Sequence, residues 1–227
     1  MAVWKNIGVG LLAVAVAYGF WLGRPQWDPE MRLWRAVGDS SLMLLFAVLA
    51  LGPLVRLYPG AVKLLSYRRE LGVWFGWLAI VHTLLVLKGW ARWDALRFLG
   101  YEYVPQLGRL VRLEPGFGLA NLLGFVAVLI TLVLMATSTN WAMRRLGGGA
   151  WKVLQMSAHT VFYLTVLHTA YFLFMHYTAS FHRTVPESPN GFRFWFLALS
   201  GLVVLLQAAA YLKVTKRPGV SSASGKS

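Results

Sequence analysis

The sequence predicts an all-α membrane protein, a bundle of six transmembrane helices, and three observations lead to this fold class. Only 13% of the 227 residues are charged and 58% are hydrophobic, whereas about a quarter of a soluble domain is charged. The apolar residues form six runs, each close to the roughly 20 residues that cross a bilayer. The eleven Trp and nine Tyr include several at the ends of these runs, as in the aromatic belts of membrane proteins.

The first three runs follow one another closely in the N-terminal part of the chain. Residues 6–23 follow Lys5 and could be a signal peptide, but no small-residue cleavage site follows, so we expect a span. Residues 39–57 contain Pro53 near their end, which neighbouring helices tolerate in a membrane. Residues 71–90 form the third span, and His82 lies well inside it.

The remaining runs complete the six. The fourth, fifth and sixth spans are expected at residues 117–136, 151–177 and 194–212, and no acidic residue is expected in the interior of any span. The longest loop, residues 91–116, mixes aromatic residues with arginines, which suggests a short interfacial helix or a re-entrant turn. Residues 213–227 are polar and rich in Gly and Ser, so we expect a disordered tail.

The distribution of charge predicts how the membrane domain, residues 1–212, is oriented. The net charge of +14 is assigned to loops beside anionic headgroups, because no soluble domain remains that could bind nucleic acid. Lys and Arg are slightly more frequent in the N-terminus, the second and fourth loops and the tail than in the other loops. The positive-inside rule therefore predicts that both termini are cytoplasmic, in a bacterial or archaeal cytoplasmic membrane.

Two histidines inside spans are candidate ligands. At 1.5 Å per residue, His82 lies about 20 Å beyond Arg69 along the third span, and His168 lies about 25 Å beyond Trp151 along the fifth span. Both spans are expected to start from the same side of the membrane. Two neutral imidazoles facing each other across a bundle suit six-coordinate haem iron, and the absence of Cys excludes a thiolate ligand. A structural hydrogen bond between helices is the alternative for each of them.

The other histidines are weaker candidates. His159 lies nine residues from His168, half a helical revolution away, so the two cannot face the same partner on a regular helix. A hydrogen bond within the bundle is favoured for His159 over a second bound group. His176 and His182 are expected at the outer interface, with a role at an outer quinone or partner site as the alternative.

The motifs of the third to fifth spans resemble the ferric-reductase-like transmembrane family. The stretches "LLSYRRELGVWFGWLAIVHTLL" and "MATSTNWAMRRLGGGAWKVLQMSAHTVFYLTVLHTAY" carry the likeness, which covers roughly residues 38–178 and is nearest to the MsrQ (YedZ) branch of haem-binding membrane subunits of methionine sulfoxide reductase systems. The resemblance implies a b-type haem between the third and fifth helices, with His82 and His168 as its axial ligands.

The sequence departs from the family pattern at Gln155, where the fifth span usually carries a further His. The position of an inner haem on the third span falls near Arg68 or Arg69, which are not ligands. One haem is therefore expected. Two haems, with His159 at the second, are the minority interpretation.

The arginines at the inner ends of the spans have two interpretations. Arg68, Arg69, Arg144 and Arg145 fit plain positive-inside charge. The alternative is that they bind haem propionates or the headgroup of a reduced flavin or quinone through charge-assisted hydrogen bonds. We therefore include Arg68 and Arg69 among the candidate cofactor-binding residues.

Three functions are consistent with these features. The leading hypothesis is an electron-transfer subunit that passes electrons from quinol or a cytoplasmic reduced flavin to an outer-face oxidoreductase, which the resemblance implies to be one that repairs oxidised methionine. The second is a haem-bearing membrane anchor of a larger respiratory complex. The third is a haem-free proton or solute transporter that uses His82, His159 and His168 as a relay.

Overall fold

A computed structural model describes residues 3–112, 114–176 and 190–216. Six of its helical segments are long and apolar enough to cross a membrane, which confirms the predicted fold class. The helices are α1 (Val3–Leu22), α2 (Pro29–Leu57), α3 (Arg68–Gly89), α4 (Ala95–Phe98), α5 (Phe117–Thr137), α6 (Asn140–Leu146), α7 (Gly148–Met156), α8 (Ala158–Ala170) and α9 (Phe192–Thr215). Between them lie the 3₁₀ segments η1 (Pro59–Tyr67) and η2 (Pro105–Leu107), the strands β1 (Tyr101–Val104) and β2 (Arg109–Arg112), and the π-helical turn η3 (Tyr171–Met175).

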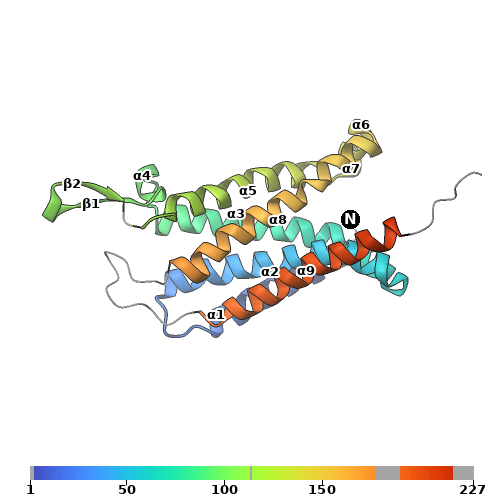
Figure 1. Cartoon of the computed structure of the whole chain (residues 1–227), viewed down its shortest axis with the longest axis horizontal. Helices are drawn as coiled ribbons and strands as arrows, with labels where there is room; N and C mark the ends of the chain where they lie inside the picture. Colours follow the sequence, from blue (N-terminus) through green and yellow to red (C-terminus); the bar gives the residue numbers. More distant parts are fainter. Residues whose placement is uncertain (1–2, 113, 177–189, 217–227) are drawn as a thin grey trace, which may run out of the picture.

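Helix α2 lies at the centre of the bundle. It packs against α1, α3 and α9, while α5 packs against α8 and α3 (Figure 1). The core contains Leu45 and Phe46 of α2, Phe162 of α8 and Phe196 of α9, all nearly inaccessible. Large apolar side chains such as Leu205, 68% exposed, cover the outside of the bundle, as expected for helices that face lipid.

Helix α2 begins ten residues before the predicted second span. The Asp28 side chain accepts hydrogen bonds from the backbone N–H groups of Glu30 and Met31, and Pro29 occupies the first turn, a combination that starts helices efficiently. Asp39 therefore lies inside the helix, nearly three turns from its start. The expectation that no acid lies within a span was wrong for this residue.

The loop between α3 and α5 contains more structure than expected. The short helix α4 agrees with the prediction, but it is followed by an antiparallel hairpin in which Tyr101 pairs with Arg112 and Val104 with Arg109. Gly108, with a φ of 61°, lies in the turn. The hairpin projects beyond the helices at one end of the bundle, with α4 close to its base (Figure 1).

The fifth span is built from three consecutive segments, α7, α8 and η3. Helix α9 continues three residues into the predicted tail, to Thr215, and the tail beyond residue 216 lies outside the described residues. The start of α1 and the end of α9 lie at the same end of the bundle, opposite the hairpin (Figure 1). The side of the membrane that this end occupies stays a prediction.

Candidate functional site

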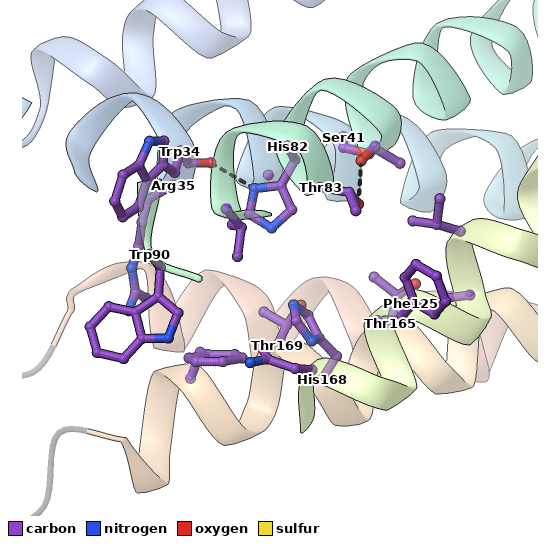
Figure 2. A pocket seen from close by; sticks show the side chains of 18 of the residues that line it. Trp34, Arg35, Ser41, His82, Thr83, Trp90, Phe125, Thr165, His168 and Thr169 are labelled. Carbon is purple, nitrogen blue, oxygen red and sulfur yellow. Dashed lines mark hydrogen bonds between the residues drawn. The ribbon is translucent and has the colours of Figure 1, made fainter. Parts of the chain in front are cut away.

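His82 of α3 and His168 of α8 face each other across a cavity in the half of the bundle nearer the hairpin. Their ring centroids are 6.5 Å apart and the ring planes are inclined by 79°. Figure 2 shows the two rings on opposite walls of the open space, with no side chain drawn between them. The pair that the sequence singled out is therefore brought together from two different helices.

Each imidazole is oriented by a backbone carbonyl of a neighbouring helix. The Nδ1 atom of His82 lies 2.8 Å from the carbonyl oxygen of Trp34 on α2, and that of His168 lies 2.7 Å from the carbonyl oxygen of Ala120 on α5. A carbonyl oxygen only accepts hydrogen bonds, so Nδ1 carries the proton in each ring. The Nε2 atom then keeps its lone pair, the form in which imidazole binds a metal.

A glycine one turn after each of these carbonyls makes room for the ring. A Cβ added to Gly38, four residues after Trp34, would lie 2.9 Å from ring atoms of His82. A Cβ added to Gly124, four residues after Ala120, would lie 2.7 Å from Nδ1 of His168. The two histidines are thus seated by the same arrangement, a carbonyl acceptor followed by a glycine on the adjacent helix.

The cavity between the histidines has a volume of about 510 Å³, within the range of cofactor sites. One end is lined by uncharged side chains, which include the apolar residues Leu42, Phe75 and Val128 and the hydroxyl residues Ser41, Thr83 and Thr165. The other end carries the charged and aromatic residues Arg35, Asp39, Trp90, Arg97, Glu102, Glu114 and His176. Figure 2 shows Trp34, Arg35 and Trp90 together at this end. We call it the arginine end.

Two acidic residues at the arginine end have close basic partners. Asp39 forms a buried ion pair with Arg24, at 2.5 Å. Glu114 lies 2.7 Å from Nδ1 of His176. The prediction placed His176 at the outer interface without a defined partner, whereas the structure gives it this carboxylate and a place in the cavity wall. His182 lies outside the described residues.

The remaining candidate residues do not line this cavity. His159, in the first turn of α8, places its Nδ1 atom 3.0 Å from the carbonyl oxygen of Met156. Arg68 and Arg69 begin α3, more than three turns from His82, and Arg69 donates a hydrogen bond of 3.0 Å to Asn140. Their role in binding haem propionates or the headgroup of a flavin or quinone stays a prediction.

Gln155 has a structural role in the half of the bundle away from the hairpin. Its Nε2 atom donates to the hydroxyl of Thr137 at 3.2 Å, and Trp151 donates to the carbonyl of the same residue at 2.9 Å. These bonds fasten α7 to the end of α5. At the position where relatives are expected to carry a further ligand, this chain has a side chain that hydrogen-bonds one helix to another.

The charged lining of the cavity is what sequence reasoning missed. Arg35 and Asp39 were assigned to the first loop and to the start of a span, because charges interrupt the apolar run there. The Asp-Pro-Glu sequence at residues 28–30 was the available signal, since it is typical of a helix N-terminus. An earlier helix start would have placed both residues on α2, level with His82.

The comparisons with known proteins agree with this architecture. The profile of a family described as "Ferric reductase like transmembrane component" matches residues 34–157. The chain is 33% identical over 152 residues to the "Protein-methionine-sulfoxide reductase heme-binding subunit MsrQ" of Bordetella parapertussis, covering 66% of each chain. It is 30% identical over 169 residues to the protein of the same name from Yersinia pseudotuberculosis, covering 74% of this chain and 75% of the relative.

Proposed function

Because this chain belongs to the ferric-reductase-like transmembrane family, we propose that it is a membrane b-type cytochrome in which His82 and His168 bind one haem. The observation that carries the proposal is the facing pair of imidazoles, each with Nδ1 bound to a carbonyl and Nε2 left for a ligand. Such outer hydrogen bonds are the usual way in which proteins orient ligating histidines.

The separation of the two rings fits a shared metal. Metal–imidazole bonds of about 2 Å and about 1 Å from each nitrogen to its ring centre would place the two ring centres roughly 6 Å apart. The measured separation is 6.5 Å. The cavity is also bounded by apolar side chains on one side and charged side chains on the other, which suits an amphipathic macrocycle.

A haem in this site would supply one-electron chemistry. The chain's own residues would hold it, fix the ring planes of the ligands and exclude water. Phe172, whose ring centroid is 5.0 Å from that of His168, packs beside this ligand. Phe75 and Leu42 close the apolar end. A low dielectric and fixed ligands are the means by which a protein sets a haem potential.

The proposed electron path runs from quinol or a cytoplasmic reduced flavin, through this haem, to an oxidoreductase on the outer face. The names of the relatives support such a partner, since both are haem-binding subunits of a protein-methionine-sulfoxide reductase. We propose one haem rather than two, because Gln155, which is engaged with Thr137, stands where a further ligand is expected, and His159 is not among the residues that line the cavity.

The test is a dithionite-reduced minus air-oxidised absorption spectrum of the purified protein. The wild type should show the sharp α band of low-spin b haem, and His82→Ala and His168→Ala should each lose it. His159→Ala is the matched control, a histidine of the same helix outside the cavity, and should keep the band. A wild type without haem bands, purified from haem-replete membranes, would refute the proposal.

A further inference from the structure

We propose that the arginine end of the cavity is a carboxylate site, in which Arg97 binds a propionate group of the haem. This contact fixes which edge of the macrocycle lies at the arginine end. This inference rests on the proposed function. It concerns residues of α2 and α4 that the sequence analysis did not select, in place of Arg68 and Arg69 at the opposite end of α3.

Arg97 is held in position at the cavity wall by its surroundings. It belongs to α4, which starts at Asp94, whose carboxylate accepts hydrogen bonds from the backbone N–H groups of Leu96 and Arg97. Its guanidinium lies 5.2 Å from the ring centroid of Trp90. On the other side of α4, Asn121 of α5 donates a hydrogen bond of 2.7 Å to the carbonyl of Phe98.

Arg97 also has unused hydrogen-bonding capacity. Its Nε atom is buried and has no hydrogen-bond partner among the described residues. Its contact with Glu102 is 3.9 Å long, beyond the length of a hydrogen bond. The side chain of Glu102 is 41% exposed, so water screens that pair. A buried guanidinium N–H without an acceptor is costly, and a planar carboxylate is the acceptor that fits it best.

The buried carboxylates at the arginine end are paired with other basic residues, so the acceptor for Arg97 would come from a ligand. The carboxylate of Asp39 is paired with Arg24, and that of Glu114 with His176. Arg35 adds a second guanidinium to the same end of the cavity, 5.9 Å from the ring centroid of Phe172. The incoming carboxylate would therefore meet Arg97 and Arg35, with Glu102 displaced toward solvent.

The polarity of the cavity gives the orientation. Haem b carries its two propionates on one edge and hydrocarbon substituents on the others. Arg35 lies beside Trp34 and Trp90 in Figure 2, and Arg97 packs on Trp90, whereas the far side of the histidines carries the uncharged residues Ser41, Thr83, Phe125 and Thr165. Only one of the two orientations along this axis places carboxylates against guanidinium groups and hydrocarbon against Phe75 and Val128.

The experiment compares haem with its dimethyl ester, which has the same ring and iron but no carboxylate charge. Full-length protein made in haem-deficient cells and purified in detergent is titrated with each compound, and binding is followed by the Soret absorbance. The variants are Arg97→Gln, Arg97→Lys and, as a matched control, Arg109→Gln on the exposed strand β2.

Arg97→Gln should weaken haem binding about tenfold, the effect of one charge-assisted hydrogen bond, and should leave binding of the ester within twofold of wild type. Arg97→Lys should lie between the two, and Arg109→Gln should change neither affinity. Equal losses for haem and ester, including complete loss from misfolding, would overturn the inference, as would no loss for either. A wild type that binds neither compound would refute the proposed function itself.

Discussion

Replacing Gly124 by Ala tests whether the glycines are what seats the histidines. The added Cβ would lie 2.7 Å from Nδ1 of His168, whereas ordinary contacts begin at 3.4 Å, so the ring must retreat by about 0.7 Å. The hydrogen bond to the Ala120 carbonyl, now 2.7 Å, would then be stretched or lost. Overpacking of this kind costs about 1–3 kcal/mol, which corresponds to a loss of about fivefold to somewhat over a hundredfold in affinity for the bound group.

The assay is the haem-to-protein ratio after purification, together with the rate at which haem passes to an excess of a haem-scavenging globin. Gly72→Ala is the matched control. It lies on α3 with nothing within 4 Å of the added Cβ, and Ala favours a helix over Gly by about 1 kcal/mol. We expect Gly124→Ala to lose haem at least about fivefold faster than Gly72→Ala. Equal rates in the two variants would refute the reasoning.

Two further predictions concern the buried ion pair and the haem count. Asp39→Asn leaves the Arg24 guanidinium, whose side chain is 7% exposed, without its counter-charge, and should destabilise the protein by about 3–5 kcal/mol, measured as a lower midpoint of thermal unfolding in detergent. The double variant Arg24→Met with Asp39→Asn should recover part of that loss, and no recovery would argue against the pair as the cause. Gln155→His should leave the haem count at one per chain, measured as pyridine haemochrome, because Arg68 and Arg69 offer no ligand on the facing helix. A count of two would contradict the one-haem assignment.

The spans were predictable because their length and apolarity are set by the bilayer rather than by the partner helices. The start of α2 was missed because Arg32 and Arg35 interrupt the apolar run, and the cap at Asp28 was not weighed against them. The hairpin was also within reach. Residues 101–104 and 109–112 are short runs with aromatic or β-branched residues on either side of a Pro-Gln-Leu-Gly turn, a pattern typical of two short strands.

The histidine pair could be predicted from the sequence for a different reason. Ionisable side chains in spans are rare, so two at compatible depths stand out. The roles of Gly38 and Gly124 could not be predicted, because a glycine in an apolar helix does not indicate which side chain of another helix packs against it. Arg97 could not be assigned to the cavity for a different reason. It is separated from His82 by a turn and a helix end, and it meets the cavity through the folding of α4.

The way each histidine is seated divides the bundle into two half-bundles. His82 on α3 takes its orientation from α2, and His168 on α8 takes its orientation from α5, while the two pairs of helices meet where α3 packs against α5. Each pair of helices therefore orients its own ligand. A group bound by both imidazoles would link the α2–α3 pair of helices to the α5–α8 pair. Its binding free energy would add to the stability of the folded bundle.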